Sequence, residues 1–234
     1  MLPSPDVYDK ENIYWPWGAL IDSIATLVST LAAPNSHVFD YMCGTGLLLR
    51  KICAIRSDIQ VEGCDINSAF VEYANSHLQK KAVRQADVRE LTVCHRNAIV
   101  LCTGGLHHLD FDEQRRFLER IAQNCDANCT IVLGEEVIQD YSTKTERRRA
   151  ALNLNTELID YALLRDCPDS LIDAALDVLR NDLLLQGEFK RPLREWRESI
   201  NQYFSIIETR HTWTPALGGG DVVLVCKPKS CVAS

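Results

Sequence analysis

An apolar run that ends in a glycine turn constrains the fold of this chain more than any other feature. Residues 38–46 read VFDYMCGTG, and the helical pattern from Leu47 to Ile52 follows at once. The glycines at positions 44 and 46 let the backbone approach a ligand closely, and the helix behind them presents unpaired N–H groups to polar atoms. This order of strand, glycine turn and helix is typical of an α/β fold that cradles a nucleoside ligand.

An acidic residue at the end of the next apolar run completes the pattern. The run from Ile59 to Cys64 leads into Asp65, about 20 residues beyond Gly44, and an acid at this spacing can accept hydrogen bonds from both ribose hydroxyls. A nicotinamide fingerprint needs a third glycine at position 49, where this chain has Leu49. The sequence therefore favours a nucleoside ligand other than a nicotinamide dinucleotide.

Two further segments narrow the ligand. With QADV at 85–88 and VLCTGGLHHL at 100–109, the chain resembles class I S-adenosylmethionine-dependent methyltransferases over about residues 36–138 and the C-terminal hairpin. The resemblance implies S-adenosyl-L-methionine as cofactor, with the glycines at the methionine moiety, an acid at the ribose and another at the adenine amine. It implies the cofactor-binding residues Asp40, Cys43, Gly44, Thr45, Gly46, Asp65, Ile66, Asp87, Val88 and Thr103.

One position departs from the family's pattern. The family usually has a glycine where this chain has Met42. The resemblance therefore implies a reshaped pocket for the methionine moiety.

Apolar runs alternate with helical patterns between residues 37 and 137, which predicts a Rossmann-like, doubly wound α/β fold. By resemblance the sheet has seven strands, mostly parallel, with an antiparallel last strand. The first five strands are expected at 37–42, 60–65, 82–86, 98–103 and 130–136. Ligands bind at the carboxyl ends of parallel strands, so five residues are expected to converge there: Asp40, Asp65, Asp87, Thr103 and Glu135.

The chain is expected to have four parts. Residues 1–35 form an N-terminal flap and helix, 36–138 the cofactor-binding core, 139–190 a helical lid inserted between the fifth and sixth strands, and 191–234 the rest of the core with a C-terminal β-hairpin. The aromatic N-terminal segment either folds over the cofactor or anchors the first helix. The insertion, which Pro168 divides into two helices, either covers the acceptor or forms a dimerisation hairpin, so a homodimer stays open.

His107, His108 and Glu135 are the candidate catalytic residues. The histidines follow the fourth strand, where the family exposes a residue toward the transferred methyl group, and a histidine there can take a proton at neutral pH. The alternative is that one or both only pack. Strand alternation points either Glu135 or Glu136 inward, so one binds an acceptor amine or hydroxyl while the other caps or faces solvent.

Composition excludes several classes of partner. The formal net charge is −7, and the one dense basic cluster, Lys144 to Arg149, is interleaved with Glu146, which argues against nucleic acid. No window approaches the roughly 20 apolar residues of a membrane-spanning helix, so no membrane partner and a cytoplasmic location are expected. Ten cysteines include no CxxC pair, and Cys125 with Cys129 lacks a second pair, so no metal site is expected.

Absent motifs point to the acceptor. The Asn/Asp-Pro-Pro-Tyr tetrad of base-modifying members is replaced by Thr103 to Leu106, and the paired-glutamate hairpin of protein arginine methyltransferases is missing. We therefore expect methyl transfer to an oxygen or nitrogen nucleophile of a small-molecule substrate, in a specialised biosynthetic pathway. The segment from Leu179 to Phe189, with Arg180, also resembles the lid of carboxy-S-adenosylmethionine synthases, which is the alternative enzyme. A non-catalytic cofactor-binding partner protein is the third hypothesis.

Overall fold

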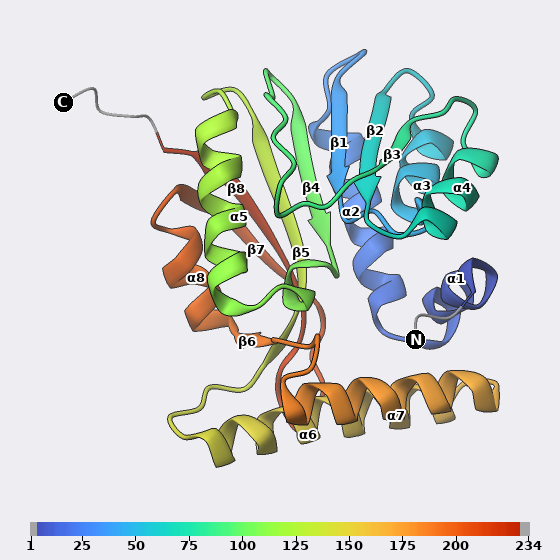
Figure 1. Ribbon diagram of the computed structural model, residues 1–234, viewed down its shortest axis with the longest axis vertical. Coiled ribbons are helices and arrows are strands. Elements are labelled where there is room, and N and C mark those ends of the chain that lie inside the picture. Colours follow the sequence, from blue (N-terminus) through green and yellow to red (C-terminus); the bar gives the residue numbers. More distant parts are fainter. Residues whose placement is uncertain (1–3, 230–234) are drawn as a thin grey trace.

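A mostly parallel sheet forms the middle layer of the structure, a computed structural model that describes residues 4–229 (Figure 1). Its strands follow the spatial order β3-β2-β1-β4-β5-β8-β7, and β6 pairs with β5 off this path. The strands are β1 (His37–Tyr41), β2 (Gln60–Asp65), β3 (Val83–Gln85), β4 (Ile99–Thr103), β5 (Thr130–Ile138), β6 (Arg191–Pro192), β7 (Phe204–Trp213) and β8 (Gly220–Pro228).

Helices cover both faces of the sheet. On one face, Phe117 and Trp196 from α5 and α8 join Tyr41 in a buried cluster. On the other, Ile24 and Ile52 from α2 and α3 pack on the opposite side of the strands. The helices are α1 (Pro5–Tyr14), α2 (Trp17–Leu31), α3 (Leu47–Ile55), α4 (Ser68–His77), the 3₁₀ turn η1 (Leu106–His108), α5 (Phe111–Asn124), α6 (Lys144–Leu163), α7 (Asp169–Leu184) and α8 (Leu193–Ile200).

The predicted fold class is confirmed. The first five strands lie where the apolar runs predicted them, and β8 runs antiparallel to β5, with Leu133 opposite Leu224. The addition is β6, through which the chain returns from α7 by pairing Arg191 with Val137 beside β5. Two residues are too short a run to produce a strand pattern in the sequence.

Capping residues set the helix starts. The Asn67 side chain accepts hydrogen bonds at the start of α4, and Asp110 forms a capping box with Glu113 at the start of α5. Thr143 and Glu146 form a second box on α6, so the acid within the basic cluster satisfies backbone N–H groups.

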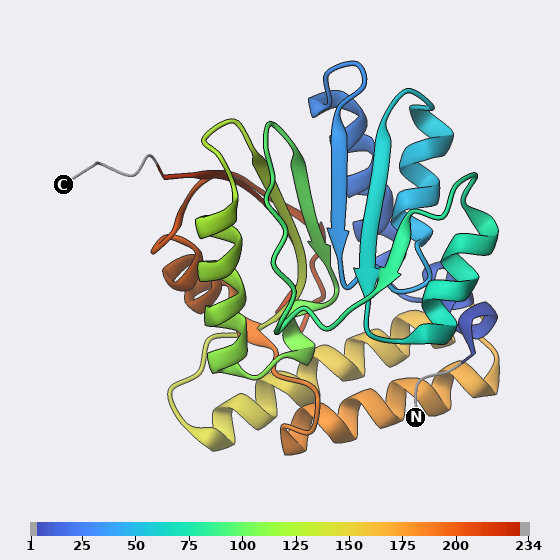
Figure 2. The ribbon, with the colours of Figure 1, turned by 45° about the horizontal axis from the view of Figure 1, so that its top comes forward.

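The insertion lies across the end of the sheet toward which the parallel strands point (Figure 1). Its two helices, α6 and α7, run side by side beneath the carboxyl ends of the strands, and α1 lies near the same edge (Figure 2). Pro168 is the N-cap residue of α7 and separates the two helices, as predicted. In the part of the chain that the structure describes, no helix combines the length and apolarity needed to span a bilayer.

Candidate functional site at the carboxyl edge of the sheet

The glycine turn and the end of β2 are joined by one carboxylate. Asp65 Oδ2 accepts a hydrogen bond from the Gly44 N–H at 2.8 Å, and its Oδ1 accepts one from the Asn67 N–H at 2.9 Å. Asp65 follows the parallel register in which Tyr41 lies opposite Cys64. The predicted ribose acid and the predicted glycine turn are therefore brought together.

The turn itself depends on left-handed backbone. Gly44 and Gly46 have φ of 53° and 71°, and a Cβ added at Gly44 would lie 3.4 Å from the Tyr8 ring. Glycine adopts this conformation without the steric cost that other residues bear. The turn thus brings the backbone at the N-terminus of α3 close to the Tyr8 ring of α1.

Met42 adopts left-handed backbone as well, with φ of 56°. This is the position where the family usually has glycine, and the conformation costs a side-chain-bearing residue about 1–2 kcal/mol. The Met42 side chain lies against Gly105, where an added Cβ would approach it to 2.9 Å. The methionine therefore occupies space beside the loop that follows β4.

Asp40 is buried and incompletely paired. Its Oδ1 has no hydrogen-bond partner among residues 4–229, and burial together with the charge of Asp65 raises the pKa of Asp40 to about 8. A cationic amino group beside this oxygen would restore the ionised form. The residues present thus fit the amino end of S-adenosylmethionine.

The residues predicted to bind the adenine of the cofactor are already engaged in contacts with other residues of the chain. Arg89 holds the Asp87 carboxylate through Nε–H at 2.9 Å and Nη2–H at 2.6 Å, and Val88 is buried. Ile66 is 56% exposed and provides an apolar surface beside Asp65. An adenine amine bound to Asp87 would share it with Arg89.

The remaining predicted cofactor residues lie at the same edge. The Cys43 N–H donates to the Cys64 carbonyl at 3.0 Å, and the Thr45 hydroxyl donates to Asp9 of α1. Thr103 ends β4, and its buried hydroxyl lacks a partner within the described chain.

Carboxylates lie beside both ring nitrogens of His107. Its Nδ1 is hydrogen-bonded to Glu135 Oε2 at 2.7 Å, and Glu135 Oε1 accepts the Leu106 N–H at 2.9 Å. Its Nε2 lies 3.7 Å from Glu188 Oε2. The ring also lines the cavity described below.

His108 differs from its neighbour. Its Nδ1–H donates to the Gly187 carbonyl at 3.0 Å, and the ring lies 3.4 Å from Glu188 Oε1. Burial opposes the charge, but the hydrogen bond and charge of Glu188 outweigh it and raise the pKa of His108 to about 9. His108 is therefore charged at neutral pH and cannot accept a proton.

Lys190 is a buried cation between β5 and the insertion. Its ammonium lies 2.6 Å from Glu188 Oε2, 3.2 Å from Glu136 Oε2 and 3.8 Å from Asp182 Oδ2. Both strand glutamates are thus engaged: Glu135 supports His107, and Glu136 lines the cavity beside Lys190. The prediction that one of them would be free to face solvent or cap is wrong, because the insertion covers this end of β5.

A cavity of about 340 Å³ lies between the carboxyl ends of β4 and β5 and the helices over them. Residues from α1, α2, η1, α6, α7 and the segment before β6 line it. Its size is in the range of small-molecule sites.

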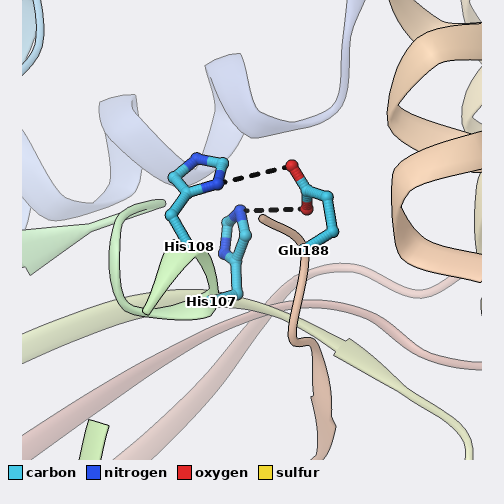
Figure 3. A group of neighbouring side chains, drawn as sticks. All are labelled: His107, His108 and Glu188. Atoms are coloured by element: carbon cyan, nitrogen blue, oxygen red, sulfur yellow. Dashed lines mark ion pairs between the residues drawn. The ribbon is translucent and has the colours of Figure 1, made fainter. Parts of the chain in front are cut away.

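His107, His108 and Glu188 bring three ligand-type atoms within 4.8 Å of one another. Figure 3 shows both rings facing the carboxylate. However, His108 Nδ1 is occupied as a donor to Gly187, and Glu188 already binds the Lys190 ammonium. These contacts describe an ion-pair cluster whose positive charges would repel a metal ion.

Sequence reasoning missed Glu11, Trp15, Trp17, Glu188 and Lys190 as site residues. The aromatic density of the N-terminal segment was a signal for the tryptophans. Glu188 lies in the segment that resembles the lid of carboxy-S-adenosylmethionine synthases, but that resemblance pointed to Arg180 as the functional residue and gave no signal for Glu188 or Lys190.

Comparisons with known proteins agree with this geometry. Residues 38–128 match the family model described as a methyltransferase domain. The carboxy-S-adenosyl-L-methionine synthase of Campylobacter fetus is 22% identical over 121 residues, which cover 50% of this chain and 51% of that enzyme. The chain thus spans about half the length of this curated relative.

Solved structures share the fold. Human N-acetylserotonin methyltransferase in complex with SAM has a TM-score of 0.62 at 14% identity, covering 92% of this chain and 53% of that one. The magnesium protoporphyrin IX methyltransferase of Synechocystis PCC 6803 with bound SAH has a TM-score of 0.60 at 16% identity, and the match covers 92% of this chain and 84% of that one. The mitomycin 7-O-methyltransferase MmcR has a TM-score of 0.58 at 15% identity, and the match covers 88% of this chain and 53% of that one.

The family model covers the glycine turn, Asp65, Asp87 and the segment after β4, which are the motifs that carried the resemblance. Domains of this kind use S-adenosylmethionine, the predicted cofactor. Residues 38–128 of this chain therefore match a methyltransferase domain in sequence, and the chain shares the fold of S-adenosylmethionine-dependent methyltransferases.

Proposed function

We propose that the protein transfers the methyl group of S-adenosylmethionine to an oxygen or nitrogen nucleophile of a small-molecule metabolite, in a specialised biosynthetic pathway. The observation that carries the proposal is the cavity of about 340 Å³ at the end of β4, which His107 lines beside its partner Glu135. A cavity of this size suits a metabolite.

The cofactor would supply a methyl group already activated on sulfur, so the chain has to align the acceptor and exclude water. Asp40, Asp65 and the glycine turn would hold the donor, and α1, α6 and α7 would cover the acceptor. His107 Nε2 would take the acceptor's proton, with Glu135 stabilising the charged ring. His108 would instead position Glu188 and the segment before β6.

The test is turnover with a metabolite extract and labelled S-adenosylmethionine. His107→Gln should retain cofactor affinity and lower kcat at least about 100-fold, the usual contribution of a positioned base. Glu135→Gln should lower kcat as well and shift the acid limb of the pH–rate profile. If the wild-type chain binds the cofactor but methylates nothing, the non-catalytic cofactor-binding protein is the better hypothesis.

The similarity to the curated relative supports a second candidate activity, that of a carboxy-S-adenosylmethionine synthase. Arg180, the residue that suggested a carboxylate site, is exposed and is not among the cavity residues, and Lys190 is already paired with carboxylates. Mass spectrometry of the cofactor after incubation with a metabolite extract, which has to supply the carboxyl donor, distinguishes the two activities, because carboxylation adds mass to the cofactor and methyl transfer removes it.

We also propose that residues 1–35 act as a flap, 36–138 as the cofactor core, 139–190 as an acceptor lid and 191–234 as the completion of the core. Replacing residues 144–184 by a short linker leaves Glu188 and Lys190 in place. The shortened chain should keep cofactor binding and lose transfer. A folded shortened chain that methylates at the native rate would make α6 and α7 an oligomerisation hairpin instead.

A further inference from the structure

We propose that the acceptor carries a basic amine, bound as a cation between Glu11 and Glu136 and against the aromatic side chains of Trp15 and Trp17. This inference rests on the proposed function, because it names the chemical class of the small molecule that enters the same cavity. The observation that carries it is that more carboxyl groups than cations line the same cavity as two tryptophan side chains.

The cavity has more acids than cations. Four carboxyl groups line it, from Glu11, Glu136, Asp177 and Glu188, and the cations among the described lining residues are Lys190 and the charged His108. Lys190 is fully engaged with Glu188, Glu136 and the neighbouring Asp182. An anionic acceptor would meet several carboxyl groups at close range, whereas a cation would complete the charge balance.

Glu11 is the acid left without a partner. It is 5% exposed, and within residues 4–229 its carboxyl group makes no hydrogen bond or ion pair. Buried carboxyl groups are normally paired, since burial without a partner is costly. A group of this kind that faces a cavity is the expected partner of a ligand.

The protonation of Glu11 supports the same conclusion. Burial and the charge of Glu136 raise the pKa of Glu11 to about 8, so the side chain is mostly protonated at pH 7 when the cavity is empty. An ammonium beside it would lower this pKa and release the proton. The titratable and charged groups that face this end of the cavity are Tyr8, His107, His108, Glu136, Asp177, Glu188 and Lys190.

The aromatic walls favour a cation over a neutral group. Trp15 packs against Leu158, Ala162 and Ala175 of the lid helices, and Trp17 lies 5.7 Å from the Tyr8 ring, centroid to centroid. Tryptophan attracts a cation that lies over the face of its ring within about 6 Å, and the attraction is stronger when the cation is desolvated. A neutral alcohol of the same shape gains neither this attraction nor the ion pair.

Matched pairs of probes test the proposal in the presence of S-adenosylhomocysteine. Calorimetry compares tryptamine with tryptophol, phenethylamine with 2-phenylethanol, and butylamine with butanol. We expect at least one amine to bind, at least tenfold more tightly than its alcohol, with proton release at pH 7 detected in buffers of different ionisation enthalpy. Glu11→Gln should weaken the amine at least tenfold and abolish the proton release, while Glu72→Gln, the same change on exposed α4, should alter neither.

Equal binding of amine and alcohol overturns the inference, as does failure of every amine to bind or full retention of amine binding by Glu11→Gln. The proposed function is judged separately. If the protein does not bind S-adenosylhomocysteine or S-adenosylmethionine, the proposed function fails. If it binds the cofactor through Asp65 but shows no preference for amines, only the acceptor class is wrong.

Discussion

Replacing Lys190 by methionine is expected to lower the free energy of unfolding by about 3–5 kcal/mol at pH 7, the usual cost of removing one partner from a buried ion pair. Methionine keeps most of the length of the side chain and removes the charge. The lysine side chain is 1% exposed and lies 2.6 Å from Glu188 and 3.2 Å from Glu136. Without it, both carboxylates stay buried with less compensation.

An exposed ion pair of the same length provides the control. Lys51 Nζ also lies 2.6 Å from a carboxylate oxygen, that of Asp22, but the two side chains are 28% and 64% exposed. Lys51→Met is therefore expected to cost less than about 1 kcal/mol. Because the substitution and the shortest distance are the same, the difference between the two variants measures burial together with the two further carboxylates around Lys190.

The pH dependence gives a second, independent readout. Burial raises the pKa of Glu188, but the charges of Lys190 and His108 outweigh burial and hold the pKa far below its usual range. The stabilisation of the folded state by ionised Glu188 is therefore fully present above the unfolded-state pKa of about 4.3. It is lost as the pH falls through the folded-state pKa. Burial lowers the pKa of Lys190, but Glu188, Glu136 and Asp182 raise it overall, so its contribution is present below about 10.4 and is lost at higher pH.

These signs fix what urea unfolding, followed by tryptophan fluorescence, should show. Between pH 5 and 9 the contribution of the pair in the wild-type protein stays constant. In Lys190→Met the carboxyl groups take up protons more easily, so the penalty shrinks from pH 7 to pH 5. A loss below 1 kcal/mol at pH 7, or a penalty that grows toward pH 5, would refute the buried ion pair.

Three further predictions concern the cofactor edge. Asp65→Ala should weaken S-adenosylmethionine binding sharply in calorimetry, because two charge-assisted hydrogen bonds of about 1.5–3 kcal/mol each are lost; unchanged affinity in a folded variant would exclude the ribose role. Gly44→Val should abolish binding, since φ of 53° and the nearby Tyr8 ring exclude a branched Cβ; normal binding would mean that the turn is misplaced. Met42→Val should lower stability to urea more than Met42→Gly, because a β-branched residue tolerates φ of 56° least; equal costs would mean that packing against Gly105 dominates.

Most of the sheet could be predicted from the sequence because its signals are local. Asp40 and Asp65 each end an apolar run at a turn, and parallel pairing then brings such ends to one edge. Asn67 and Asp110 likewise start helices through hydrogen bonds to backbone groups two or three residues away. Each of these predictions needed only the residues beside it.

The acceptor side could not be predicted because its contacts are long-range. Lys190 is buried by residues from β5 and α7, and no pattern near GEFK distinguishes a buried lysine from an exposed one. Glu11 lies in a helix with polar neighbours and faces the cavity only because α1 folds against the lid. For the same reason the sequence could not decide which of Glu135 and Glu136 is buried. The alternation of a strand gives the direction of each side chain, but it does not show which segment of the chain covers that side.

The two adjacent histidines, His107 and His108, have different environments in the fold. Glu135 comes from β5 and is hydrogen-bonded to His107 Nδ1. Glu188 comes from the end of the insertion and, with the Gly187 carbonyl, keeps His108 charged. The insertion also reaches His107, because Glu188 Oε2 lies 3.7 Å from His107 Nε2 and the Phe189 N–H donates to the His107 carbonyl at 2.6 Å. Under the proposed function, changes near Glu188 are therefore expected to affect both histidines, whereas changes elsewhere in α6 and α7 are expected to affect mainly the choice of acceptor.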